Sequence, residues 1–432
     1  MSKPRFVISC PFDTYSGYGA RSRDIVKAII ELDKYEVQLL PQRWGETAWN
    51  FCLDHPEWKF LLKYTVPQNW QQTQPDIWAQ ITIPNEFQPL GKYNIGLTAG
   101  IESTACKAEW IQGLNRMDMN WVSSNFAKNT FEAMTYEKKD SRTNQVVEQV
   151  KLTKPIEVIF EGVDITTYKP LKASKIQNMD LSTIKEDFCY LFVGHWMNGA
   201  FGHDRKNVGV LVKSFYDAFK NKIGKRPALI LKASTGAATY LSRDTILDRI
   251  KTIKDVYGKA KLPNIYVLSG EFDDNEVNEL YNHPKIKAMV SFTKGEGFGR
   301  PLLEFSTTGK PIIASGWSGH MDFLNPEFNV LLPGELENVD PSAANDWLIK
   351  EAQWFKISPT HAISSLKEVY KHYKKYHQRS KKQRYHAIKN YSCEKMKELV
   401  NVKLDTNLPQ FAKQVELKIP TLNLPKLKKI DK

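Results

Sequence analysis

Short apolar runs alternate with longer segments of helical spacing along most of the chain. The run "RFVISC" (5–10) has the β-branched content and length of a buried strand, whereas "DIVKAIIEL" (24–32) repeats apolar residues at helical intervals. Further strand-like runs lie at 35–40, 77–82, 93–98, 120–124 and 156–160, with helix-like segments such as 103–114 between them. This alternation predicts a parallel sheet with helices on both faces.

A second series of the same kind runs from "FCYLFVG" (188–194) to "KPIIAS" (310–315). Before it, residues 136–155 are polar and irregular and are interpreted as a surface excursion, and 161–182 lacks hydrophobic periodicity, as in a linker. We therefore predict an α/β protein of two Rossmann-like, doubly wound domains, residues 1–170 and 171–390. Such domains bind ligands in the cleft where the carboxyl ends of their strands meet.

Length and composition agree with two globular domains. The chain has 432 residues, of which 41% are hydrophobic and 25% charged, as in ordinary soluble proteins. Its five cysteines are scattered without C-x-x-C spacing, which indicates reduced thiols. No apolar run reaches the roughly 20 residues of a membrane span, and the first ten residues lack a secretory pattern, so a cytoplasmic location is expected.

The net charge of +13 is unevenly distributed. Residues 1–170 hold 19 Lys and Arg against 20 Asp and Glu, residues 171–366 hold 24 against 22, and residues 367–432 hold 18 against 6. The first domain is therefore near neutral, and the positive excess belongs to the C-terminal region. The prolines of the last segment, 408–432, exclude a long helix there and favour an extended basic tail that docks a partner or stays solvated.

The stretch "GEGFGRPLLE" (295–304) places Glu296 in a loop and Glu304 in the helix that follows. Three glycines let the backbone approach a ligand closely, and Pro301 suits the first turn of a helix. Free N–H groups at such a helix start attract hydroxyls or anionic oxygens. The alternative is that Glu304 only stabilises the helix N-terminus and that Glu296 is a solvated loop residue.

A second loop follows the strand that ends near residue 194 and holds Arg205, Lys206 and Asn207 before a helix. Cationic side chains beside a helix N-terminus are what a leaving diphosphate needs as negative charge develops on it. The alternative is a solvated basic loop.

Two loops of the first domain are also candidates. "SGYGARSR" (16–23) follows the first strand and contains Gly17 and Gly19, a weak pattern that a tight turn also explains. "GLTAGIESTA" (96–105) ends another strand and contains Glu102, which is either a site residue or the start of a helix.

The stretch "GEGFGRPLLEFSTTGKPIIAS", with "LYNHPKIKAMVSFTK" before it, resembles the E-x7-E signature of retaining GT-B glycosyltransferases, especially family 4. The resemblance implies that Glu296 contacts the donor sugar hydroxyls and that Glu304 accepts hydrogen bonds from the ribose. It also implies that the backbone at Gly297, Phe298 and Gly299 lines the pocket for sugar and phosphate.

By the same resemblance, Arg205 and Lys206, with Asn207 beside them, bind the diphosphate. Many family members carry an arginine directly after the strand's glycine, where this chain has His195. Either Arg205 supplies that charge or His195 contributes as a donor. Lys232, at the end of "ALILK", is a further candidate or simply a lysine at a strand end.

The resemblance places Gly17 and Gly19 against the diphosphate or acceptor and Glu102 at the border of the reaction centre. In "ASGWSGHMDFL" (314–324), it brings Gly319 and His320 near the donor, although His320 also fits an ordinary loop histidine.

The resemblance covers roughly residues 5–405. "IFEGVDITTYKP" (159–170) resembles the segment that closes the first domain, and "YSCEKMKELV" (391–400) resembles the start of a helix, 391–407, that crosses back to it. The aspartates of "EFDD" (271–274) are interpreted as a helix cap, so no metal and no cofactor are expected. The expected partner is a nucleoside diphosphate sugar as co-substrate.

The chain is therefore expected to be a retaining glycosyltransferase whose acceptor is a glycan, a protein or a modified DNA base. It also resembles the family 4 versions of tailed phages, which brings DNA into consideration. The rival hypothesis is a non-catalytic binding protein of the same fold that acts through its basic tail.

Overall fold

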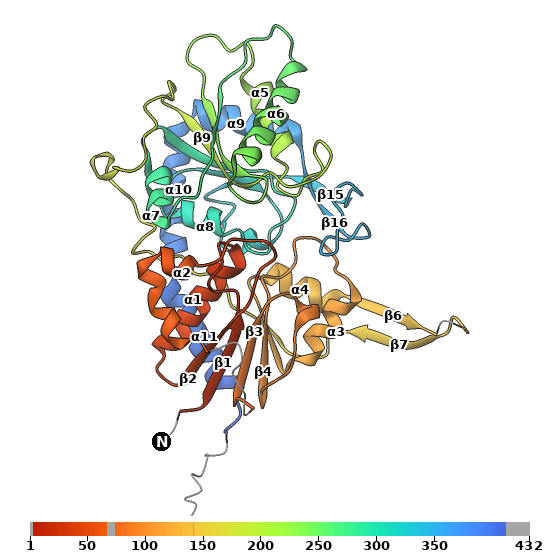
Figure 1. Cartoon of the computed structure of the whole chain (residues 1–432). Helices are drawn as coiled ribbons and strands as arrows, with labels where there is room; N and C mark the ends of the chain where they lie inside the picture. Colours follow the sequence, from red (N-terminus) through yellow and green to blue (C-terminus); the bar gives the residue numbers. More distant parts are fainter. Residues whose placement is uncertain (1–2, 67–73, 141, 412–432) are drawn as a thin grey trace, which may run out of the picture.

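The computed structural model describes residues 3–66, 74–140 and 142–411. It consists of two α/β domains stacked along the long axis of the molecule, with the N-terminal domain below the second in Figure 1. Each domain contains one six-stranded parallel sheet. The predicted architecture of two doubly wound domains is therefore confirmed.

The first sheet has the strand order β2-β1-β3-β4-β5-β8. Its strands are β1 (Arg5–Cys10), β2 (Glu36–Pro41), β3 (Ile77–Ile81), β4 (Tyr93–Leu97), β5 (Met119–Val122) and β8 (Ile156–Val158). Phe6 and Ile8 of β1 pack beneath the helices of one face, while Val7 between them packs against the opposite face. Burial on both faces explains why the strands are continuous apolar runs.

Helices cover both faces of this sheet. One face is covered by α1 (Gly17–Glu31) and α11 (Cys393–Asn407), the other by α3 (Ala108–Arg116) and α4 (Asn125–Ala133). Smaller elements complete the domain: α2 (Phe51–Asp54), η1 (Pro56–Tyr64) and η2 (Pro84–Glu86).

The second sheet has the order β11-β10-β9-β12-β13-β14. Its strands are β9 (Cys189–His195), β10 (Ala228–Ser234), β11 (Ile265–Leu268), β12 (Ile286–Ser291), β13 (Ile312–Ser315) and β14 (Val330–Leu332). One face packs against α5 (Val208–Phe219), α6 (Tyr240–Asp255) and α9 (Pro359–Lys371); the other packs against α7 (Asp274–Asn282), α8 (Arg300–Ser306) and α10 (Tyr373–Asn390). The remaining elements are η3 (Ala173–Lys175), η4 (Gly319–Asp322) and the antiparallel pair β15 (Gly334–Asn338) and β16 (Gln353–Ile357).

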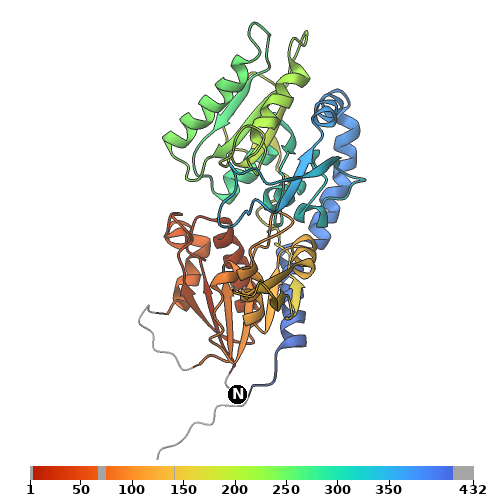
Figure 2. The same cartoon turned by 90° about the vertical axis from the view of Figure 1, so that its right-hand side faces the viewer.

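Helix α11 leaves the second domain and packs on the first, as Figure 2 shows at the edge where the last helices run downward. Its Met396, Val400 and Leu404 belong to the core of the first domain. The chain passes between the domains twice, near Val163 and again just before α11. These two segments lie side by side, because Val163 N donates to Tyr391 O at 2.8 Å and Cys393 N donates to Val163 O at 3.0 Å. The predicted crossing helix is thus present, while the exact domain limits at 170, 390 and 407 stay predictions.

Two local expectations are wrong. Residues 136–155 do form a surface excursion, but it is not irregular, since β6 (Thr135–Lys139) and β7 (Val146–Lys151) form an antiparallel hairpin that projects from the first domain (Figure 1). The helix expected at 103–114 begins only at Ala108.

The basic tail lies outside the described residues from 412 onward, while Leu408 and Phe411 pack on the core of the first domain. In the described parts of the chain, no helix combines the length and apolar character that crossing a membrane requires.

Candidate functional site

Loops from the carboxyl ends of both sheets meet in very close contact. A Cβ atom on Gly295 would lie 1.8 Å from the carbonyl oxygen of Glu102, and one on Gly297 would lie 2.5 Å from that of Ala99. Ser124 Oγ donates to Gly297 O at 2.6 Å. Glycine is required at 295 and 297 because any side chain would push the two domains apart.

Glu296 lies in this contact and is held as a carboxylate by two cations. Lys206 Nζ lies 2.5 Å from Glu296 Oε1, and Arg205 Nη1 lies 3.5 Å from Oε2. Burial would raise the pKa of Glu296, but Lys206 and Arg205 outweigh it and lower that pKa to about 2. The alternative of a solvated loop glutamate is therefore wrong, since Glu296 is buried and accepts from Lys206.

Arg205 connects the second domain to the first. Its Nη1 lies 3.1 Å from Glu102 Oε1 and also donates to Gly295 O at 2.9 Å. Arg205, Lys206, Glu102 and Glu296 therefore form one cluster of two cations and two carboxylates. Burial lowers the pKa of Lys206, with Glu296 opposing it, so a strongly anionic ligand would favour its charged form.

The loop that carries Arg205 and Lys206 ends at Asn207, the residue before α5. Asn207 adopts a left-handed conformation with φ 55°, and its N–H donates to Asp204 O at 2.9 Å. Its side-chain oxygen is buried without a hydrogen-bond partner among the described residues. The alternative of a solvated basic loop does not hold, because both cations are occupied by the carboxylate cluster.

His195 and Lys232 lie at the ends of neighbouring strands beside this cluster. His195 Nδ1 is 2.8 Å from Ser234 Oγ; partial desolvation of the ring, together with Lys206 and Arg205, lowers the pKa of His195 to about 4. The ring is therefore neutral near pH 7. The cationic side chains beside it are Arg205 and Lys206. Lys232 Nζ donates to Gly270 O at 3.1 Å, and burial lowers the pKa of Lys232.

Glu304 is oriented by two partners that differ from those of Glu296. Arg300 Nε lies 2.9 Å from its Oε1, and the Tyr281 hydroxyl donates to Oε2 at 3.4 Å. Burial raises the pKa of Glu304 to about 7, although Arg300 opposes the shift. Arg300 also lies 2.6 Å from Asp24 Oδ2 on α1, so this network spans the two domains.

The sequence reasoning missed Arg300 and Asp24. Arg300 precedes Glu304 by four residues on α8, and this spacing alone indicates an ion pair on one helix face. No local pattern indicates Asp24, because it contacts Arg300 only through the packing of one domain on the other.

The loop after β13 packs directly on the Glu296 loop. Gly319 N donates to Glu296 O at 2.9 Å, and Glu296 N donates to Ser318 Oγ at 2.9 Å. His320 is buried, with Nε2 2.7 Å from Ser315 O. The Phe298 side chain belongs to the core, with its ring centroid 5.0 Å from that of Phe323.

The glycines of the remaining loops differ in their surroundings. A Cβ on Gly19 would meet Thr14 O at 2.3 Å, whereas one on Gly17 would meet nothing within 4 Å. Gly299 has φ 97° and directly precedes α8. Glu102 lies six residues before α3 begins, which overturns the alternative that it starts a helix.

The aspartates after β11 are structural. Asp273 caps α7 and forms a capping box with Glu276, as the sequence indicated, and Asp274 accepts from the Tyr168 hydroxyl at 2.9 Å. Within the described residues, no group of three His, Cys, Asp or Glu side chains could hold a metal ion.

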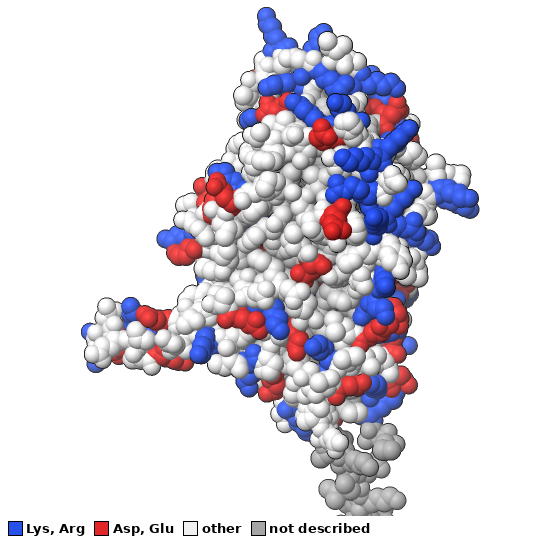
Figure 3. Space-filling view, turned by 180° about the vertical axis from the view of Figure 1, so that it is seen from behind, with Lys and Arg blue, Asp and Glu red and all other residues white. Residues whose placement is uncertain are grey.

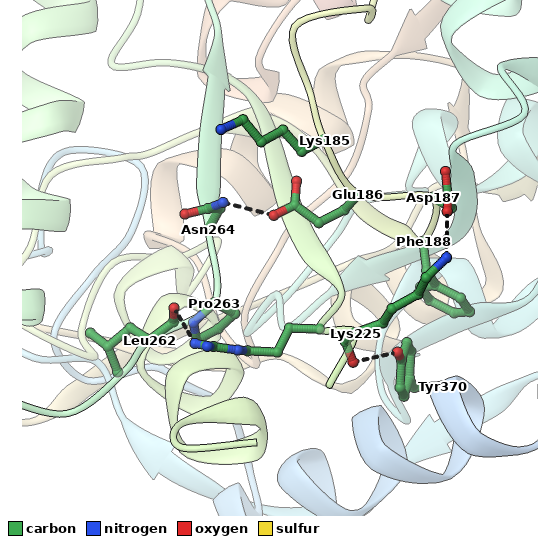
Figure 4. Close-up of a pocket in the computed structure, with 10 residues that line it drawn as sticks. Lys185, Glu186, Asp187, Phe188, Lys225, Leu262, Pro263, Asn264 and Tyr370 are labelled. Carbon is green, nitrogen blue, oxygen red and sulfur yellow. Dashed lines mark hydrogen bonds and ion pairs between the residues drawn. The ribbon is translucent and has the colours of Figure 1, made fainter. Parts of the chain in front are cut away.

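A groove of about 680 Å³ lies between the domains next to Arg300 and is lined by α1, the 163–168 linker, and the starts of α7 and α11. A separate cavity of about 440 Å³, shown in Figure 4, lies between Lys185, Arg226 and Asn264. It borders the amino ends of β9, β10 and β11. Because open parallel sheets bind ligands at the opposite ends of their strands, it is not the candidate site.

Comparison with solved structures identifies the fold of the chain. No family model and no curated protein match the chain. Sucrose-phosphate synthase from Thermosynechococcus elongatus matches with a TM-score of 0.60 and 13% identity, over 94% of this chain and 98% of that one. The fold is GT-B.

Two further GT-B structures agree with this. HepE from Anabaena, in complex with UDP and glucose, matches with a TM-score of 0.58 and 14% identity, over 93% of this chain and all of that one. The lipopolysaccharide outer core galactosyltransferase WaaB matches with 0.55 and 15%, over 93% and 99%. At these identities the likeness shows the GT-B fold alone.

Proposed function

We propose that this protein is a retaining glycosyltransferase of the family 4 type that takes its sugar from a nucleoside diphosphate sugar. The observation that carries the proposal is the cluster of Arg205, Lys206 and Glu296, with Glu102 facing it from the other domain. The UDP and UDP-glucose complexes of HepE, which has the same fold, support this class of donor.

In the proposed reaction, the diphosphate of the donor binds Arg205 and Lys206 and takes over contacts that Glu102 and Glu296 now make. The bond between the anomeric carbon and the phosphate oxygen breaks, and the departing oxygen gains negative charge near both cations. Fixed charges placed where charge develops are the largest single source of catalysis in many enzymes.

The acceptor hydroxyl attacks the same face of the sugar that the diphosphate leaves. Its proton passes to the departing phosphate oxygen, so the products are the glycoside and the protonated nucleoside diphosphate. Glu296 holds the sugar hydroxyls, because an ionised carboxylate accepts hydrogen bonds through both of its oxygens.

Glu304 is proposed to bind the ribose, at the end of the donor opposite to the transferred sugar. One of its oxygens is already fixed by Arg300, and among the described residues the other accepts only the long contact from Tyr281. The second oxygen therefore has capacity for a ribose hydroxyl. Gly17, at the start of α1, has the open space that a diphosphate needs near a helix N-terminus.

Release of nucleoside diphosphate from a panel of nucleoside diphosphate sugars tests the proposal. Wild-type protein is expected to turn over at least one donor, and Glu296→Gln is expected to lose about 100-fold or more of kcat, as when a key polar contact to the transition state is removed. Glu335→Gln, an exposed glutamate on β15, is the matched control and should keep full turnover. Full activity of Glu296→Gln would contradict the site assignment.

A further inference from the structure

The positive charge of the chain is concentrated in a folded helix rather than in the terminal tail. Residues 367–390 contain nine Lys or Arg and a single acidic residue, Glu368, whereas residues 408–432 contain six Lys and two acidic residues. The first of these segments thus accounts for eight of the thirteen net positive charges. It comprises the end of α9 and all of α10.

The fold turns the basic side chains of α10 outward along one row. Ser380, Gln383 and Ala387 face inward and are buried, and Gln383 is fixed by donating to Phe323 O at 2.7 Å. On the outer side, the exposed residues Lys374, Lys381, Lys382, Tyr385 and Lys389 recur at intervals of about one or two turns. At 1.5 Å per residue the row from Lys374 to Lys389 is about 22 Å long. Figure 3 shows Lys and Arg gathered along this edge of the second domain.

These cations have no acidic partner in the described ranges of the chain. Among the ion pairs of the described residues, none involves a Lys or Arg of α10, whereas the neighbouring helix α11 pairs Lys395 with Glu398 and Lys403 with Glu157. Lys287 adds positive charge beside the helix, because its Nζ lies 5.9 Å from the ring centroid of Tyr373 at the start of α10.

We propose that the outer face of α10 binds the phosphate backbone of a nucleic acid. A linear row of unpaired lysines releases counterions when it contacts a polyanion, and this release provides most of non-specific nucleic-acid affinity. Tyr385, which is 68% exposed and has Lys389 Nζ 5.8 Å from its ring centroid, adds an aromatic surface on which a base can stack.

An anionic membrane fits this face less well. A helix that lies in a membrane interface inserts an apolar side, and electrostatic attraction alone gives weak binding. Tyr385 is the one large hydrophobic side chain of α10 that is exposed, and the aliphatic side of the helix faces the protein core. Phosphate contacts without insertion are therefore the better match.

The test measures fluorescence anisotropy of a labelled 30-base-pair DNA duplex and of a 30-nucleotide single strand over a range of salt concentrations. The variant replaces Lys374, Lys381, Lys382 and Lys389 by Glu. The control replaces Lys251, Lys254, Lys259 and Lys261, which are also exposed and lie on or just after α6, by Glu, so both variants have the same net charge.

Wild type and control are expected to bind both probes, and the α10 variant to lose at least tenfold in affinity at low salt. Its slope of log K against log salt should be smaller in magnitude by about 3.6, as expected for four lost phosphate contacts on duplex DNA. Tyr385→Ala should weaken binding of the single strand more than that of the duplex.

Three outcomes would overturn the proposal: equal losses in the α10 and control variants, no binding of either probe by wild type, or α10-dependent binding to phosphatidylserine vesicles without nucleic-acid binding. A second version with Gln in place of Glu, checked for the wild-type unfolding temperature, separates loss of binding from loss of folding. No sugar donor is present, so the result is independent of the proposed glycosyl transfer.

Discussion

Glu296 and Glu304 differ in charge state although both are buried and lie eight residues apart. Two cations lower the pKa of Glu296 to about 2, whereas burial raises that of Glu304 to about 7 although Arg300 opposes the shift. The two carboxyls therefore suit different tasks. Glu296 accepts hydrogen bonds at every physiological pH, while Glu304 changes its protonation near neutrality.

The raised pKa of Glu304 predicts a pH dependence of stability. Between its ordinary value of 4.5 and about 7, the folded chain keeps a proton that the unfolded chain has lost, so stability falls as the pH rises through this range. Glu304→Gln removes that loss. Wild type should therefore lose about 1–3 kcal/mol of unfolding free energy between pH 5 and pH 8 that Glu304→Gln does not lose. This is the energy of one to two pKa units.

Urea unfolding of wild type, Glu304→Gln and the exposed control Glu335→Gln at both pH values measures this effect. The control should follow the wild type. The same pH dependence in all three proteins would show that Glu304 does not titrate in this range.

At the scale of elements, α8 and α1 are joined across the domains by the pair Arg300 and Asp24, 2.6 Å apart. Asp24 is 7% exposed, so its loss leaves the Arg300 charge with Glu304 as its remaining close partner. Asp24→Asn should lower the unfolding free energy by about 1–3 kcal/mol, the cost of an incompletely satisfied buried group.

The matched control for this change is Asp33→Asn, because Asp33 pairs with Lys3 at the surface with 89% of its side chain exposed. Such pairs contribute little, so the control should change stability by less than about 0.5 kcal/mol. Equal effects of the two substitutions in urea unfolding would contradict the role of Asp24 in joining the domains.

The contact between the Glu296 loop and the loop after β4 depends on Gly295. A Cβ there would lie 1.8 Å from Glu102 O, so Gly295→Ala must shift backbone and open the contact. The variant should lose about 1–3 kcal/mol of stability, as in overpacked cores, together with most of the thermal stabilisation by a bound donor. Gly236→Ala, where no atom lies within 4 Å, is the control. An unchanged donor-dependent shift in Gly295→Ala would show that the loops need not touch.

On the scale of the whole molecule, apolar runs such as residues 5–10 and 188–194 were sufficient to predict both sheets, because strands buried on two faces are continuously hydrophobic. The same reasoning missed β6 and β7, whose side chains are mostly exposed and therefore carry no apolar alternation. It gave no helix for α10 either, which buries only Ser380, Gln383 and Ala387.

The candidate site was predictable to a similar degree. Local spacing within a loop and the helix that follows it indicated Glu296 and Glu304, and the loop before α5 indicated Arg205 and Lys206. The sequence did not indicate which residues of the two domains pair. The contact of Arg205 with Glu102 joins residues 103 positions apart, and that of Arg300 with Asp24 joins residues 276 positions apart. Such contacts depend on how the two domains close on each other.

The stereochemistry of the first product tests the central claim most directly. Proton NMR during turnover of a nucleoside diphosphate α-hexose, with water or a supplied acceptor, reports the anomeric configuration before mutarotation. The proposed mechanism predicts that the α-anomer appears first, and that Glu296→Gln forms neither product nor nucleoside diphosphate at a comparable rate. A β-anomer appearing first, or undiminished turnover by Glu296→Gln, would contradict the account.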